Sequence, residues 1–219
     1  ANVSHELRTP LTNIQGFAET LLNPSVKSEQ DKVQFIKIIH NHAARLGAII
    51  EDLLTLSRVE KDTDQNEVKL EDAIIRPILE SAISLCQDKA KERNINIIIN
   101  CPIDLVANLN PPLIEQAIIN LLDNAIKYAN ENSEINLNAI LSEKMIILAV
   151  KDEGAGIEKE HLDRLFERFY RVDKARSRKI GGTGLGLSIV KHIALAHSGK
   201  VEVESEINKG STFRIYIPA

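Results

Sequence analysis

His5 and Glu6, within "VSHELRTPLT" at residues 3 to 12, are the first side chains whose types suggest chemistry. A histidine here could be a packing residue, a metal ligand or a nucleophile. The stretch begins like the zinc-protease motif HExxH, but Thr9 stands where the second histidine belongs, which disfavours a metal site. A neutral imidazole is available near pH 7, and Glu6 could accept its Nδ1 proton as a general base. An exposed acid without a catalytic role is the competing interpretation of Glu6.

The stretch "NLLDNAIKYA" at residues 120 to 129 gathers groups that suit a metal-bound polyphosphate. On a helical wheel Asn120, Asn124 and Lys127 share one stripe, with Tyr128 at its margin. An Asn carbonyl is a hard oxygen ligand for Mg²⁺, which takes the rest of its shell from water and phosphates. Lys127 would then meet the phosphate charge. An ordinary polar helix face is the alternative.

Asp152 follows an alternating apolar strand in "AVKDEGAGI" at residues 149 to 157. This pattern places a carboxylate at the rim of an apolar interior, where it needs a hydrogen-bond donor. An adenine amino group is one candidate donor. Alternatively, Asp152 only shapes the turn before Gly154 and Gly156.

A second glycine cluster, "GGTGLGLSIV" at residues 181 to 190, opens another helix. Gly182, Gly184 and Gly186 would let backbone amides approach phosphates at the helix N-terminus. The cluster fits neither GxGxxG nor the P-loop pattern, which excludes the Rossmann and P-loop folds. Between the two glycine clusters, the basic segment 166 to 180 would suit a mobile lid over a polyphosphate.

These groups need two kinds of scaffold, the first of which is a helical hairpin. Apolar residues alternate spacings of four and three from Leu7 to Leu21 and again from Ile36 to Leu53, which predicts two helices, the second ending near Ser57. His5 and Thr9 then lie on the outer face, so a packing role for His5 is disfavoured. A lone hairpin leaves its apolar seam half exposed, so we expect a homodimer that forms a four-helix bundle.

The second scaffold is an α/β sandwich after a polar linker at residues 58 to 67, which gives domains at 1–60 and 61–219. We expect a mixed sheet with helices packed on one face. The expected helices are 73–93, 111–129 and 184–198, and the expected strands are 95–100, 105–109, 134–141, 145–152, 200–206 and 211–217.

Composition excludes some partners. The net charge of −4 lacks the surplus of Lys and Arg that a nucleic-acid binder needs. The sequence has no run of about 18 apolar residues, so we expect no membrane contact within this chain and a cytoplasmic location.

Taken in order, these stretches resemble the catalytic core of a bacterial two-component sensor histidine kinase of the HisKA type, over essentially all 219 residues. "SHELRTPL" is similar to the H box, "NLLDNAIKYA" to the N box, "DEGAGI" to the G1 box, "FERFYR" to the F box and "GGTGLGLSIV" to the G2 box. The resemblance implies the ATP-binding sandwich shared with Hsp90, gyrase and MutL, here the cytosolic portion of a longer sensor, membrane-anchored or not. The flanking sequence resembles phosphate-regulon-type sensors.

The resemblance also implies activity and site residues. ATP and Mg²⁺ would support autophosphorylation of His5, followed by transfer to an Asp on a response regulator receiver domain. Glu6 would be the base, Thr9 would help to dephosphorylate the regulator, Asn124 would bind Mg²⁺ and Asp152 would bind adenine. The other implied ATP-binding residues are Asn120, Lys127, Tyr128, Gly154, Gly156, Arg171, Gly182, Thr183, Gly184, Leu185 and Gly186.

Two competing functions remain open. One is a Ser/Thr kinase or ATPase of the same superfamily, which would need only residues 70 to 219. The other is a dimeric scaffold that binds nucleotide without transferring phosphate.

Overall fold

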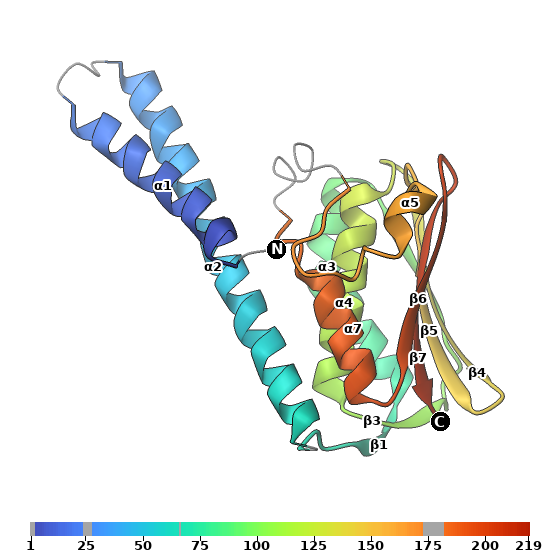
Figure 1. Ribbon diagram of the computed structural model, residues 1–219. Coiled ribbons are helices and arrows are strands. Elements are labelled where there is room, and N and C mark those ends of the chain that lie inside the picture. Colours follow the sequence, from blue (N-terminus) through green and yellow to red (C-terminus); the bar gives the residue numbers. More distant parts are fainter. Residues whose placement is uncertain (1–2, 24–27, 66, 173–181) are drawn as a thin grey trace.

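The computed structural model describes residues 3–23, 28–65, 67–172 and 182–219. A long helical hairpin leans against an α/β domain (Figure 1). The hairpin consists of α1 (Val3–Leu22) and α2 (Glu29–Asp64), and Ser28 caps α2 by accepting the backbone N–H of Asp31. The expected αα-hairpin is therefore confirmed.

The second helix is longer than its sequence pattern predicts. It was expected to end near Ser57, but α2 continues to Asp64, so most of the expected linker is helical. The reason is that Leu56 and Val59 are buried where α2 packs on a helix of the α/β domain. The expected boundary between residues 60 and 61 falls inside this helix.

The hairpin keeps an apolar stripe uncovered. Three residues of the expected seam, Leu11, Ile36 and Ile50, are more than two-fifths exposed. Val33 and Leu54 extend this stripe on α2. The seam therefore faces outward in the isolated chain, as it should if a second hairpin covers it.

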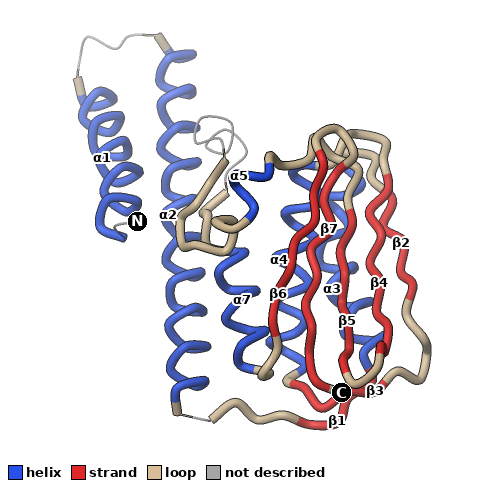
Figure 2. Tube along the Cα trace, turned by 45° about the vertical axis from the view of Figure 1, so that its right-hand side comes forward, coloured by secondary structure: helices blue, strands red, loops and turns tan. Residues whose placement is uncertain are grey.

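The α/β domain has a five-stranded sheet in the order β2-β4-β5-β7-β6, in which β2 and β4 are parallel and the other neighbours antiparallel. Three helices cover one face of the sheet (Figure 2). They are α3 (Ile75–Glu92), α4 (Pro111–Tyr128) and α7 (Gly186–Ala196). The sheet strands are β2 (Asn96–Asn100), β4 (Glu134–Ser142), β5 (Met145–Lys151), β6 (Lys200–Glu206) and β7 (Gly210–Pro218). The predicted mixed sheet with helices on one face is confirmed.

A small second sheet differs from the expectation. The strand β1 (Glu71–Ile74) was not expected, and it pairs antiparallel with β3 (Val106–Leu109). The helix predicted from residue 73 therefore begins at Ile75. A short α5 (Lys159–Leu162) precedes the F box. Within the described residues, no helix combines the length and apolarity that a membrane crossing requires.

Candidate functional site

The helix α4 supplies one wall of a cavity between the hairpin and the sheet domain. Asn110 begins the helix, since its side chain accepts the backbone N–H of Leu113 at 3.1 Å, and prolines follow at 111 and 112. One face is buried in the core by Ile114, Ile118, Leu121 and Leu122. The opposite stripe is polar and faces the cavity, as the wheel predicts.

The polar stripe lines a cavity of about 350 Å³. Asn120, Asn124, Lys127 and Tyr128 all contribute to its surface. The Nδ2 atom of Asn120 is buried and has no hydrogen-bond partner among the described residues. A buried donor without an acceptor costs about 1–3 kcal/mol, so this amide suits a ligand that brings an acceptor.

Asp152 lies at the end of β5 and lines the same cavity with only 5% of its surface exposed. Its Oδ1 accepts the backbone N–H of Gly154 at 2.8 Å, so the turn-shaping role is real. Burial raises the pKa of this carboxyl, while hydrogen bonds with the backbone of Gly154 and Ser211 oppose the rise. The Asp152 side chain thus shapes the turn and also presents a buried hydrogen-bond acceptor at the cavity wall.

Gly154 itself does not line the cavity, although Gly156 does. A Cβ on Gly154 would lie 2.4 Å from the carbonyl oxygen of Tyr128, and a β-bridge joins Ala129 to Gly154. Only glycine allows this approach. Gly154 therefore fixes the C-terminal end of α4, and with it Lys127 and Tyr128, against the turn that holds Asp152.

The start of α7 forms another wall. Gly182, Thr183, Gly184 and Gly186 line the cavity, whereas the Leu185 side chain is buried in the core. Gly184 has φ +80°, a left-handed conformation that favours glycine. This turn opens a helix N-terminus toward the cavity, a feature that favours anions.

The segment after the short helix α5 closes this side of the cavity. Arg171 lines the cavity and donates a hydrogen bond to the carbonyl of Gly182. Of the expected lid at 166 to 180, residues 173 to 180 lie outside the described residues.

Lys127 lines the same cavity and interacts with an acid that the sequence reasoning missed. Its Nζ is 3.9 Å from Asp123, which also accepts a hydrogen bond from Lys89 at 2.8 Å. Asp123 lines the cavity too. Its place three residues after Asn120, on the same stripe, is the signal that could have found it.

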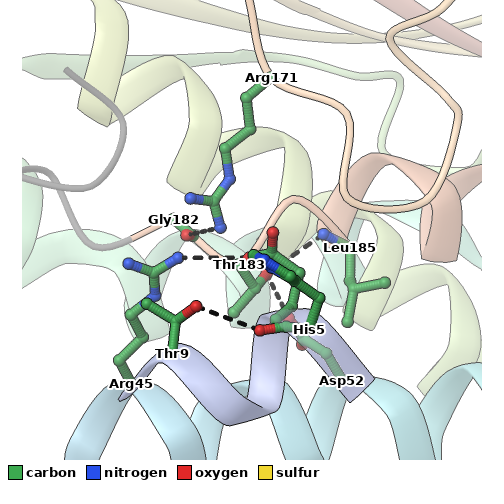
Figure 3. Close-up of polar contacts among 9 residues, drawn as sticks. His5, Thr9, Arg45, Asp52, Arg171, Gly182, Thr183 and Leu185 are labelled. Carbon is green, nitrogen blue, oxygen red and sulfur yellow. Dashed lines mark hydrogen bonds and ion pairs between the residues drawn. The ribbon is translucent and has the colours of Figure 1, made fainter. Parts of the chain in front are cut away.

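The hairpin also contributes to the cavity, which the sequence reasoning did not foresee. Ala48 and Asp52 of α2 line it, and Oδ2 of Asp52 accepts a hydrogen bond from the Thr183 hydroxyl at 2.6 Å (Figure 3). The same Thr183 oxygen accepts the backbone N–H of Leu185 at 3.2 Å. Burial is the largest cause of a raised pKa at Asp52, partly offset by Thr183.

His5, Glu6 and Thr9 lie on α1 outside the cavity. His5 and Thr9 are exposed, as predicted, and the Thr9 hydroxyl donates to the carbonyl of His5 at 3.2 Å (Figure 3). Glu6 faces Arg45 of α2, with 3.8 Å between Oε2 and a guanidinium nitrogen. Arg45 precedes Asp52 by seven residues, about 10 Å along a helix axis, so the start of α1 lies within about two helical turns of the cavity wall.

Comparisons with protein families match both parts of the chain. Residues 109–219 match the family described as histidine kinase-, DNA gyrase B-, and HSP90-like ATPase. Residues 1–62 match the His Kinase A (phospho-acceptor) domain.

Among curated relatives, the chain is 37% identical over 225 residues to sensor histidine kinase WalK of Bacillus subtilis, covering 100% of this chain and 36% of WalK. It is 36% identical over 218 residues to sensor protein SrrB of Staphylococcus aureus, covering 100% of this chain and 37% of SrrB. The chain thus spans little more than a third of the length of these relatives.

Among solved structures, Acinetobacter baumannii histidine kinase AdeS matches with a TM-score of 0.77 and 28% identity, covering 98% of this chain and 97% of AdeS. Histidine kinase ThkA, solved in complex with response regulator protein TrrA, matches with a TM-score of 0.76 and 24% identity. That match covers 99% of this chain and 59% of the ThkA chain, and it shows a shared fold.

Proposed function

Because the chain belongs to the family of histidine kinase-, DNA gyrase B- and HSP90-like ATPases, with a His Kinase A phospho-acceptor domain before that fold, we propose that it autophosphorylates His5 from ATP. One observation carries this proposal. The polar stripe of α4, with the unpaired Asn120 amide, lines a cavity whose outer wall is the same helix that pairs with Glu6. The proposed nucleotide site and the helix start that carries the proposed nucleophile therefore both border the same short part of α2.

The cavity has an adenine end and a phosphate end. Asp152 is the buried acceptor that suits an adenine amino group. Asn120, Lys127 and the start of α7 at Gly184 offer an amide donor, an ammonium and a helix N-terminus to the phosphates.

A divalent metal fits this donor set. Asn124 lines the cavity one helical turn after Asn120, and a carboxamide oxygen is a ligand that suits Mg²⁺. When bound, Mg²⁺ would neutralise charge on the β and γ phosphates. The chain's own residues orient the nucleotide and exclude water around it.

In the proposed reaction, a ring nitrogen of His5 attacks the γ-phosphorus in line. The N–P bond forms as the bond from that phosphorus to the bridging oxygen breaks, and ADP leaves. Glu6 takes the proton from the other ring nitrogen. Glu6 follows His5 directly in the sequence, and its carboxylate also lies 3.8 Å from the Arg45 guanidinium of α2.

The exposed positions on the hairpin support two partners. His5 and Thr9 lie on the same open face of α1, where a response regulator receiver domain could accept the phosphoryl group on an Asp and Thr9 could orient water for dephosphorylation. The uncovered stripe with Leu11, Ile36 and Ile50 supports a homodimer. Since the relatives are longer sensor proteins, the chain is proposed to be the cytoplasmic portion of one; a phosphate-regulon subtype remains a prediction.

The decisive experiment is incubation with γ-labelled ATP and Mg²⁺, followed by mapping of the label. We expect acid-labile, alkali-stable label on His5, and none in a His5→Gln variant that binds ATP as tightly as wild type. Label on a serine or threonine would instead support the Ser/Thr kinase alternative. ATP binding without any label would support the non-catalytic scaffold.

A further inference from the structure

Asp52 is a carboxylate from the hairpin that lies in the wall of the proposed nucleotide cavity. Its Oδ2 accepts the Thr183 hydroxyl at 2.6 Å, and Ala48, one turn earlier on α2, lines the cavity beside it. Thr183 is part of the turn that opens α7. The contact therefore joins the hairpin to the phosphate end of the cavity.

The Asp52 carboxylate adds a negative charge to this end of the cavity. Lys127 acts electrostatically on Asp52, and the same ammonium lies 3.9 Å from Asp123. Asp123 is paired more closely with Lys89, at 2.8 Å, so Asp52 is the carboxylate that the hairpin adds beside Lys127 in a partly buried space. Each further negative charge brought to this end is opposed by Asp52, and a phosphate oxygen also competes with Asp52 for the Thr183 hydroxyl.

A second contact keeps Asp52 in place. Glu60 of α2, two turns after Asp52, forms an ion pair with Arg168 of the F box, and its carboxylate also lies 3.0 Å from Nε2 of His192 on α7. Both partners belong to the sheet domain. Movement of α2 as a rigid helix away from the sheet domain therefore breaks the contacts of both Asp52 and Glu60.

We propose that Asp52 is a specificity-determining residue that lowers the affinity of this docked arrangement for a nucleoside triphosphate relative to a diphosphate. The inference rests on the proposed nucleotide site. The third phosphate adds charge where the Asp52 carboxylate lies and takes the Thr183 hydroxyl from it. A bound triphosphate thus favours release of the sheet domain from α2, and a diphosphate permits the docked arrangement to persist.

Calorimetric titration with Mg²⁺ and either ADP or a β,γ-imido ATP analogue tests this inference. In Asp52→Asn, the ratio of the analogue Kd to the ADP Kd should fall about fivefold, the effect of one unit charge pair about 4 Å apart at the dielectric of water. Glu51→Gln is the matched control, because it removes the same charge from the preceding, exposed residue of α2. That control should leave the ratio unchanged.

Glu60→Gln provides a second variant from outside the cavity. It loosens the same docking, so it should lower the ratio in the same direction by a smaller factor. An unchanged ratio in both Asp52→Asn and Glu60→Gln overturns the inference. A raised ratio in Asp52→Asn also overturns it, because Asp52 would then assist the triphosphate, for instance through its metal. Failure of the wild type to bind either nucleotide would refute the proposed nucleotide site instead.

Discussion

His197 provides a pH-dependent link between α7 and the start of the helix that carries the site. The residue is 2% exposed, its Nδ1 lies 2.7 Å from the Ile193 carbonyl oxygen, and its Nε2 accepts the backbone N–H of Asn110 at 2.9 Å. Asn110 is the N-cap of α4. Only a neutral imidazole can donate at one nitrogen and accept at the other, so protonation of His197 must break the bond to Asn110.

Burial lowers the pKa of His197, against a smaller opposing effect of the Ile193 hydrogen bond. In the unfolded chain the imidazole titrates near about 6.5. Above that pH both states are neutral and the full stability is present. As the pH falls below it, the unfolded state binds a proton that the folded state resists, so stability is lost until the folded-state pKa is passed. The loss is about 1.4 kcal/mol per pH unit within that window.

Urea unfolding followed by circular dichroism at pH 7.5 and pH 5.5 measures this loss. Wild type should lose about 1 kcal/mol more than His197→Gln over this interval, because Gln does not titrate. His192, whose pKa burial also lowers, adds to the loss in both proteins and cancels in the comparison. Equal pH dependence in wild type and variant would refute the assignment of a neutral, buried His197.

Three further predictions concern the proposed site. Asn124→Ala should reduce autophosphorylation about tenfold or more by removing an oxygen ligand of Mg²⁺. A wild-type rate in a labelled-ATP assay would show that Asn124 is not a ligand of the metal. Asp152→Asn should raise the Kd for ATP roughly fivefold, since a carboxylate accepts more strongly than an amide, and an unchanged calorimetric Kd would remove Asp152 from the adenine end. Thr9→Ala should keep autophosphorylation within about a few-fold of wild type while prolonging the life of a phosphorylated regulator, because its exposed hydroxyl lies away from the cavity. Equal decay of labelled regulator with both proteins would leave Thr9 without a phosphatase role.

The elements that the sequence predicts well are those whose burial has a simple period. β5 alternates Ile146, Leu148 and Val150 toward the core, and α4 buries one side of its wheel. The short β1 has no such alternation, since only one of its four residues is even half-buried. It forms because its backbone pairs with β3, a contact about 35 residues away in the chain.

The same distinction separates the site residues that could be predicted from those that could not. Asn120, Asn124 and Lys127 share one helix face, so their convergence follows from the helical period alone. Asp52 belongs to the hairpin and reaches the cavity only because α2 packs on α7. Its own neighbourhood in the sequence is an ordinary amphipathic helix, which carries no sign of a nucleotide.

This packing changes what must precede phosphoryl transfer in the proposed mechanism. Arg45, which holds Glu6, and Asp52, which holds Thr183, lie about 10 Å apart along one helix. The start of α1, which carries the proposed nucleophile, and the phosphate end of the cavity therefore both border the same part of α2. Any movement of the sheet domain along or away from α2 must break the contacts of Asp52 and Glu60. We therefore expect the strength of these two contacts to affect the rate at which His5 meets the γ-phosphate in the proposed reaction.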